Sequence, residues 1–321
     1  MLPSVFVSRI IPDAGLDRVK AACAADIWPD DMPPAYDVLV QRVRGKDGLL
    51  CTLNDRIDAA LMDAAGGQLK VISQMAVGYD NIDVNAARER GIQIGNTPGV
   101  LTDATADLAF ALLLAAARRI VEGVEYIKTG QWKTWLPKVL LGGDLSGATL
   151  GIVGLGRIGK AVARRASGFD MRILAHSPRC TPEAAAQVNA ELTSLERLLH
   201  ESDYVTLHVP LNVQTRHLIN RETLALMKPS AILVNTTRGP VVDQRALYDA
   251  LRAGVIAGAA LDVTDPEPLP ADDPILQLPN VIIVPHIGSA SQRTRDRMAT
   301  MAAENLIAGV NGQPLPNPVW T

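Results

Sequence analysis

Short runs of aliphatic and β-branched residues alternate with longer segments of helical spacing along almost the whole chain. In the first hundred residues this pattern predicts strands at 5–8, 48–52, 70–75 and 91–95, with a helical segment at 57–65. Such alternation is typical of parallel sheets that are covered by helices on both faces. The pattern therefore predicts the fold class α/β.

A long helix rich in alanine and leucine is predicted over 103–120, with Thr102 or Asp103 as its N-cap. A second series of strands follows it, and a last helix is predicted over 291–308. This second series comprises predicted strands at 149–153, 171–175, 204–209, 231–235, 256–262 and 281–284. Six strands that alternate with helices predict a doubly wound sheet of the dinucleotide-binding type.

The composition narrows the possible functions. The chain has 321 residues, 48% of them apolar, which suffices for two packed domains and excludes a disordered chain. A net charge of −3 without basic runs argues against nucleic acid as a partner. The longest apolar run, 108–117, is too short for a bilayer, and no signal sequence is evident, so we expect a cytoplasmic protein. Cys23, Cys51 and Cys180 lack metal-ligand spacing, so we expect thiols and no metal.

A glycine-rich turn lies directly after the first strand of the second series. It contains Gly154, Leu155, Gly156, Arg157, Ile158 and Gly159, and it opens a helix predicted over 158–167. In a dinucleotide fingerprint one glycine makes the tight turn, one admits the pyrophosphate and one lets helix and strand pack closely. The turn therefore predicts cofactor binding at the positive end of this helix.

The next strand lacks the acid that would bind a free ribose 2′-hydroxyl. It is followed by His176, Ser177, Pro178 and Arg179, and no acidic residue occurs from 171 to 182. A guanidinium can offer paired donors to a 2′-phosphate. We therefore predict that NADP(H) is preferred and that NAD(H) is possible. The alternative is that His176 and Arg179 are solvated surface residues.

Three residues at the ends of successive strands are candidates for hydride-transfer chemistry. Arg238 would hold an anion, and His286 would act as the general acid. Glu267, if its carboxylate touched the imidazole, would favour the protonated ring and fix its tautomer. Three alternatives stay open: Arg238 pairs with Asp243, Glu267 is a loop acid, and His286 is a satisfied buried histidine.

The motifs taken together resemble the D-isomer-specific 2-hydroxyacid dehydrogenases, with most likeness to the glyoxylate/hydroxypyruvate reductase branch. The resemblance rests on 154–159, 235–239, 261–270 and 285–290, and it extends over nearly the whole chain. It implies a Rossmann cofactor domain, 101–288, inserted into a flavodoxin-like substrate domain formed by 1–100 and 289–321. It also implies an active site in the cleft between the two domains.

By this resemblance, Arg238 binds the carboxylate and carbonyl of the substrate, His286 gives the proton and Glu267 supports His286. The amides of Val77 and Gly78 would hold the carboxylate. Ser289 would contact the substrate, and Trp135 would reach the pocket of a neighbouring subunit in a homodimer. Further cofactor contacts are implied for Ser177, Arg179, Pro210, Thr215, Thr236, Thr237, Asp262 and Gly288. Pro178, which precedes Arg179, departs from the pattern of the branch.

The resemblance predicts NADPH-linked reduction of glyoxylate to glycolate and of hydroxypyruvate to D-glycerate. One alternative is another dehydrogenase of the family, of the D-lactate, phosphoglycerate or phosphite type. A second alternative is a nucleotide-sensing binding protein without catalysis, similar to transcriptional corepressors that share this fold. The presence of Arg238, Glu267 and His286 together favours an enzyme.

Overall fold

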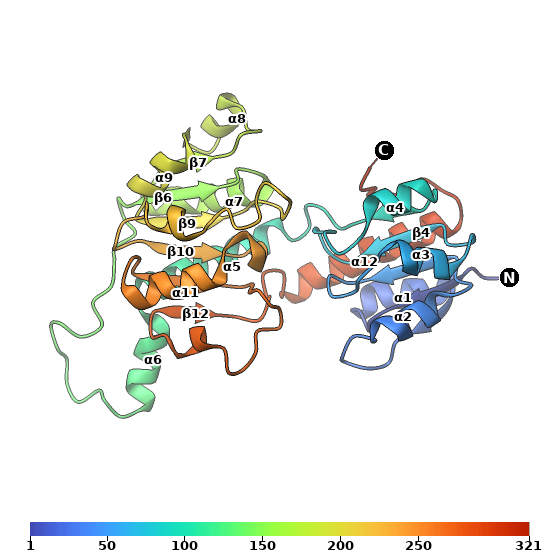
Figure 1. Cartoon of the computed structure of the whole chain (residues 1–321), viewed down its shortest axis with the longest axis horizontal. Helices are drawn as coiled ribbons and strands as arrows, with labels where there is room; N and C mark the ends of the chain where they lie inside the picture. The colour runs from blue at the N-terminus through green and yellow to red at the C-terminus, as the bar shows by residue number, and fades with distance from the viewer. Residues whose placement is uncertain (321) are drawn as a thin grey trace. The chain divides into compact units, whose positions relative to one another are not determined.

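The chain divides into two compact units, which are described separately. The computed structural model describes residues 1–320. Unit 1 is formed by Met1–Leu101 together with the chain from Ala290 onward, and unit 2 by Thr102–Ser289. Each unit contains its own parallel sheet with helices on both faces, as Figure 1 shows. The predicted α/β fold with two parallel sheets is confirmed.

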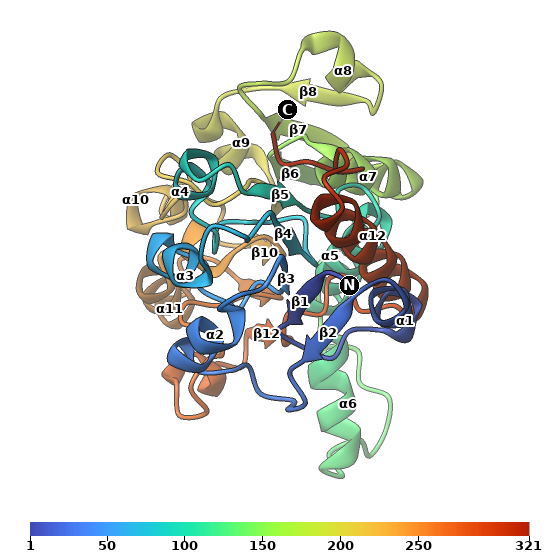
Figure 2. The same cartoon turned by 90° about the vertical axis from the view of Figure 1, so that its right-hand side faces the viewer.

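Unit 1 contains a five-stranded parallel sheet with the strand order β2-β1-β3-β4-β5. Its strands are β1 (Ser4–Val7), β2 (Ala24–Ile27), β3 (Gly48–Cys51), β4 (Val71–Gln74) and β5 (Gln93–Gly95). In Figure 2 the helices α1 (Asp13–Ala22) and α12 (Gln292–Val310) cover one face. The opposite face carries α2 (Tyr36–Val43), α3 (Ala59–Ala65) and α4 (Val84–Glu89). This strand order is that of flavodoxin-like sheets.

Unit 2 contains a seven-stranded parallel sheet with the order β12-β11-β10-β9-β6-β7-β8. Its strands are β6 (Thr149–Val153), β7 (Arg172–His176), β8 (Ala190–Leu192), β9 (Tyr204–Leu207), β10 (Ile232–Asn235), β11 (Gly258–Leu261) and β12 (Val281–Ile283). Its helices are α5 (Thr102–Ala117), α6 (Ile120–Lys128), α7 (Arg157–Ala166), α8 (Pro182–Ala186), α9 (Leu195–Glu201), α10 (Arg221–Leu224) and α11 (Gln244–Ala253). The reversal of direction at β6 places a topological switch point where β6 and β9 are neighbours.

Two apolar cores lie on opposite faces of the sheet of unit 2. Leu150 and Ile152 of β6 pack with α5 and α7 on one face, and Val153 packs with α9 and α11 on the other. On β10, Val234 belongs to the first core and Leu233 to the second. Because side chains alternate along a strand, both cores fix the register of the same strands. The carboxyl ends of the strands are thereby held at one edge of the sheet.

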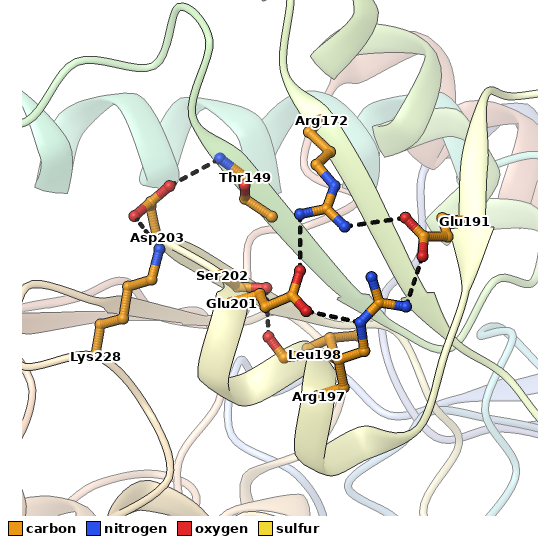
Figure 3. A network of polar contacts seen from close by, with 9 residues as sticks. All are labelled: Thr149, Arg172, Glu191, Arg197, Leu198, Glu201, Ser202, Asp203 and Lys228. Carbon is orange, nitrogen blue, oxygen red and sulfur yellow. Dashed lines mark hydrogen bonds and ion pairs between the residues drawn. The ribbon is translucent and has the colours of Figure 1, made fainter.

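A closed ring of ion pairs stabilises the β7–β8 edge of this sheet, as Figure 3 shows. Arg172 binds Glu191 at 3.0 Å and Glu201 at 2.7 Å, and Arg197 binds the same two carboxylates at 2.6 Å each. Single exposed pairs contribute little stability. Here each side chain has two partners, so β7, β8 and α9 are tied together.

The structure differs from the sequence predictions at four elements. The strands β2 and β8 were not predicted, because 24–27 and 190–192 are short edge segments with few buried aliphatic residues. The helix predicted over 103–120 ends at Ala117, since Arg119 adopts a left-handed conformation with φ of 53° and α6 begins after it. Thr102 and Asp103 are the first two residues of α5, so neither is its N-cap. Within residues 1–320, no helix is long and apolar enough to cross a membrane.

Candidate active site

The glycine-rich turn connects β6 to α7, as the sequence predicts. Gly154 has φ of 99°, and a Cβ there would lie 2.6 Å from the His208 carbonyl oxygen. A Cβ on Gly159 would lie 2.1 Å from the Gly154 oxygen, whereas one on Gly156 would meet nothing within 4 Å. Two glycines thus permit a tight turn and close packing, and the third leaves open space at the N-terminus of α7. This is the division of roles that pyrophosphate binding requires.

The other residues expected to bind the cofactor follow neighbouring strands of the same sheet. Ser177 and Arg179 come after β7, Thr236 and Thr237 after β10, and Asp262 after β11. Because parallel strands end at the same edge of the sheet, these segments lie on one side of it. In the loop after β9, the Thr215 hydroxyl donates to the Pro210 carbonyl at 2.6 Å.

Two buried polar atoms in the segments that follow β9 and β10 have no partner within the described part of the chain. They are Thr236 Oγ1, which follows β10, and His208 Nδ1, which follows β9. Burial lowers the pKa of His208 to about 3, so its ring is neutral at physiological pH, and Nε2 lies 2.9 Å from Thr206 Oγ1. Buried polar groups normally have partners. These atoms and the open glycine turn fit a bound nicotinamide dinucleotide.

His286 and Glu267 form a close pair. His286 Nδ1 lies 2.5 Å from Glu267 Oε1, and the side chains are 25% and 32% exposed. The contact at Nδ1 orients the ring and leaves Nε2 for other partners. His286 has φ of 53°, a left-handed conformation that is uncommon outside glycine and is concentrated at functional sites. Glu267, which lies in the loop after β11, therefore has the His286 ring as its partner.

Asp262 holds the segment that carries His286. Its carboxylate accepts hydrogen bonds from the Ile287 amide at 2.6 Å and the Gly288 amide at 2.8 Å. Its carbonyl oxygen accepts from the His286 amide at 2.9 Å. Burial raises the pKa of Asp262, and the hydrogen bonds from the Ile287 and Gly288 amides oppose this effect. This clamp was not predicted, since the sequence assigned Asp262 only to cofactor binding.

Asn235 plays a similar part for Arg238. The Asn235 side chain accepts from the amide and the hydroxyl of Thr237 at 3.0 and 2.8 Å, and it donates to the Arg238 carbonyl at 3.0 Å. Asp243, the alternative partner of Arg238, caps α11 by accepting from the Ala246 amide at 3.0 Å. The segment 235–238 is therefore fixed from within. A buried asparagine at the end of a strand was the signal for this role.

The remaining candidates lie elsewhere in the chain. Val77 and Gly78 belong to unit 1, in the segment after β4, and Ser289 is the last residue of unit 2. Trp135, in the segment between α6 and β6, is 80% exposed. No hydrogen bond or ring contact joins Trp135 to His286 within residues 1–320.

A dinucleotide turn on a doubly wound sheet, together with a carboxylate–imidazole pair, defines an NAD(P)-dependent oxidoreductase. The model of the NAD binding domain of the D-isomer specific 2-hydroxyacid dehydrogenases matches residues 110–288. Glyoxylate reductase from Korarchaeum cryptofilum is 54% identical over 318 residues, covering 99% of this chain and 96% of the relative. The chain belongs to the D-isomer specific 2-hydroxyacid dehydrogenase family.

Other relatives agree with this assignment. Glyoxylate reductase from Thermococcus litoralis is 50% identical over 321 residues, covering 99% of this chain and 96% of the relative. A crystal structure of a protein from Thermus thermophilus matches with a TM-score of 0.92 and 51% identity, covering 98% and 99% of the two chains. The NADPH-dependent glyoxylate/hydroxypyruvate reductase from Sinorhizobium meliloti, in complex with NADP and malonate, matches with a TM-score of 0.87 and 31% identity, covering 100% and 97%.

Proposed function

We propose that this protein reduces small 2-oxo acids, glyoxylate to glycolate and hydroxypyruvate to D-glycerate, with NADPH as the preferred cofactor. The observation that carries the proposal is the Glu267–His286 pair, held by Asp262 at the edge of a sheet that contains a dinucleotide turn. The glyoxylate reductases to which this chain is similar support the choice of substrate.

Each candidate residue has a defined part in this proposal. His286 gives a proton to the carbonyl oxygen of the substrate, and Glu267 keeps the imidazole in the orientation that leaves Nε2 available. Arg238 binds the carboxylate and the carbonyl, since a guanidinium can donate to two oxygens at once. The amides of Val77 and Gly78 and the side chain of Ser289 complete the binding of the substrate. The bound nicotinamide supplies the hydride.

The preference for NADPH rests on the segment after β7. Arg179 is exposed and forms no ion pair with residues 1–320, so its guanidinium is available to a 2′-phosphate. Ser177, two residues earlier, can add a hydroxyl donor. The name of the relative from Sinorhizobium meliloti, an NADPH-dependent enzyme bound to NADP, agrees with this proposal.

Steady-state kinetics with glyoxylate, hydroxypyruvate, pyruvate, phosphohydroxypyruvate and phosphite, each with both cofactors, tests the proposal. We expect the highest kcat/KM for glyoxylate or hydroxypyruvate with NADPH. A higher value for pyruvate, phosphohydroxypyruvate or phosphite would assign the chain to another branch of the family. Cofactor binding without turnover of any of these compounds would favour the nucleotide-sensing alternative, and equal efficiency with NADH would refute the cofactor preference.

We also propose a homodimer that forms through the arm composed of α6 and the segment up to residue 141. None of the side chains of α6 is buried, and the arm exposes apolar groups that include Ile127 at 59%, Trp132 at 62% and Trp135 at 80%. Exposed apolar patches of this kind mark protein interfaces. Light scattering should show a dimer for the wild type and a monomer for Ile127→Asp. A monomeric wild type would refute the proposal.

A further inference from the structure

The segment 75–81 of unit 1 contains the two amides to which the proposed function assigns the substrate carboxylate. Neither the Val77 nor the Gly78 N–H group has a hydrogen-bond acceptor within residues 1–320. The carbonyl groups of the same segment, by contrast, are all occupied from Ala76 to Tyr79. The segment thus directs its carbonyl groups toward donors in the protein and leaves these two N–H groups without acceptors in the described part of the chain. An unstructured loop would not show this difference, so groups outside the segment impose it.

The donors to these four carbonyl groups are two buried side chains and the backbone amides of Thr97 and Ile82. The Thr97 amide donates to Ala76 O at 3.0 Å. Asn96 Nδ2 donates to Val77 O at 2.9 Å, and Gln74 Nε2 donates to Gly78 O at 3.1 Å. A peptide group is planar, with its N–H opposite its C=O. A bond to Ala76 O therefore fixes the direction of the Val77 N–H, a bond to Val77 O fixes that of the Gly78 N–H, and a bond to Gly78 O fixes the peptide that follows. Asn96 thus orients the Gly78 amide directly, whereas Gln74 holds the next peptide group and so limits the rotation of Gly78.

The two side-chain donors are themselves held in place. Gln74, at the end of β4, is 0% exposed, and its Nε2 also donates to Asn81 Oδ1 at 2.8 Å. Asn81 Nδ2 in turn donates to the carbonyl groups of Thr52 and Asp55 at 3.1 and 2.8 Å. Because backbone oxygens only accept hydrogen bonds, these contacts fix the orientation of both amide groups. Buried networks that are satisfied in this way are rigid.

Asn96 is anchored by its backbone. Its amide donates to Asn317 O at 3.1 Å, and its carbonyl accepts from Asn305 Nδ2 at 2.9 Å. Asn96 is 8% exposed, so water competes little for its side chain. Both donors to the segment therefore occupy fixed positions before any substrate binds.

We propose that Asn96 and Gln74 are positioning residues that aim the amides of the segment 75–81 at the carboxylate of the substrate. The proposal rests on the proposed function for the identity of the bound group. Binding is stronger when donors are oriented beforehand, because less conformational freedom is lost. The loss of either donor should weaken the binding of the carboxylate and leave the transfer steps in unit 2 unchanged.

The test uses the neutral substitutions Asn96→Leu and Gln74→Met, since an introduced carboxylate would repel the substrate directly. We expect KM for glyoxylate to rise about tenfold and kcat to change by less than about twofold, as for the loss of one hydrogen bond. The methyl ester of glyoxylate lacks the anionic group, so its kcat/KM should change by less than about threefold. An unchanged KM for glyoxylate, or an equal loss with the ester, would overturn the proposal.

Ser73→Ala is the matched control. Ser73 is buried, belongs to the same strand as Gln74, and donates to Ala302 O at 2.7 Å on the side of α12. Its removal costs a buried hydrogen bond in unit 1 without touching the segment 75–81. We expect this variant to keep the wild-type KM for glyoxylate. A rise in KM equal to that of Gln74→Met would show that a general loss of order in unit 1 raises KM, which would contradict the proposal.

Hydrogen exchange provides a measurement that does not depend on turnover. The Thr97 and Ile82 amides donate to Ala76 O and Tyr79 O, so their protection reports the order of the segment. We expect both to exchange faster in Asn96→Leu and Gln74→Met than in Ser73→Ala. If the wild type fails to reduce any 2-oxo acid, the proposed function is refuted. Unchanged exchange of the Thr97 and Ile82 amides in both variants would refute the positioning role independently of that result.

Discussion

The two units build their candidate binding groups from different kinds of side chain. In unit 2 the candidate groups carry charged side chains. Glu267 pairs with His286, and the Asp262 carboxylate holds the two residues that follow His286. In unit 1 the segment 75–81 offers only backbone amides, and neutral side chains such as Gln74 and Asn96 hold it. The first arrangement can move a proton, whereas the second can only bind and orient.

This difference follows from the cost of burial. Gln74 can be fully buried because each of its polar atoms has a neutral partner, which costs little once the hydrogen bonds form. A charged group is far more costly to bury without partners, and the side chains of Glu267 and His286 accordingly stay 32% and 25% exposed. The carboxylate of Asp262 is buried, but it accepts hydrogen bonds from two backbone amides. We therefore expect substitutions of Glu267 and His286 to lower kcat and those under the segment 75–81 to raise KM.

The largest effect is expected for His286→Ala. Loss of a positioned general acid should lower kcat by about 10²- to 10⁴-fold. The dissociation constant of NADPH, measured by fluorescence, should change little, because the glycine turn and the loop after β7 remain intact. His200→Ala, at an exposed position of α9, is the control and should behave as the wild type. Undiminished kcat in His286→Ala would remove the proton-transfer role from unit 2.

A smaller effect is expected for Arg179→Gln, which tests whether a charge in unit 2 selects the cofactor. The loss of a charged donor to the 2′-phosphate should lower kcat/KM for NADPH about 10- to 100-fold and leave that for NADH nearly unchanged. The control is Arg252→Gln, an exposed arginine in the last turn of α11. Equal losses of kcat/KM with NADPH and NADH would show that Arg179 does not recognise the 2′-phosphate.

Glu267→Gln should lower kcat about tenfold, because a hydrogen bond to a charged partner is replaced by a neutral one. Glutamine has the same shape and can still accept from Nδ1, so the orientation of the ring is retained. Glu267→Ala removes that acceptor as well and should cost more. Equal kcat values for the wild type and both variants, measured under saturating substrate, would contradict a supporting role for Glu267.

Much of unit 2 could be predicted from the sequence, because its signals are local. Each of these signals is a short continuous stretch of sequence, as in the glycine turn and in the residues that follow β10, β11 and β12. The predicted strand 149–153 likewise agrees with β6. Edge strands are different. β8 contains three residues, and only Ala190 is buried, so the sequence has no hydrophobic run that would indicate a strand there. Its place depends on pairing with β7, a contact that the local sequence does not encode.

Asn235 acts on its near neighbours Thr237 and Arg238, whereas the other polar supports depend on residues distant in sequence and could not be predicted. Asn81, which accepts from Gln74, donates to the carbonyl groups of Thr52 and Asp55, and Asn96 donates to Val77 O across 19 positions. A neutral amide in a sequence does not reveal which backbone oxygen it will reach. Charged residues at the ends of strands suggest chemistry, whereas side chains that position a backbone become evident only once the chain is folded.

Asp55 is the exception in unit 1, a charged residue within the neutral network. It is 2% exposed, and its Oδ2 accepts from the Ser8 hydroxyl at 2.6 Å and the Thr52 amide at 2.7 Å. Its Oδ1 has no hydrogen-bond partner in the described part of the chain. Burial raises the pKa of Asp55, although these hydrogen bonds oppose the effect. The charge at this position should therefore reduce the stability of the folded state at neutral pH.

Asp55→Asn tests this reasoning and is expected to have the smallest effect. A raised pKa in the folded state contributes stability that is present at acid pH and lost as the pH rises through that pKa. The free energy of unfolding of the variant, relative to the wild type, should therefore increase from about pH 4 to neutrality. Urea unfolding across this range measures the difference, and a relative decrease would contradict the prediction.

Asp58→Asn is the matched control, with the opposite sign. Desolvation would raise the pKa of Asp58, but hydrogen bonds from Tyr36 and the Leu61 amide and the charge of Arg56 outweigh it, so this pKa is lowered. Stability from Asp58 is present above the pKa of the unfolded chain and is lost as the pH falls. Asp58→Asn should therefore be most destabilising at neutral pH, where Asp55→Asn is most favourable. If both variants followed the same pH trend, global charge and not the local burial of Asp55 would set the stability of unit 1.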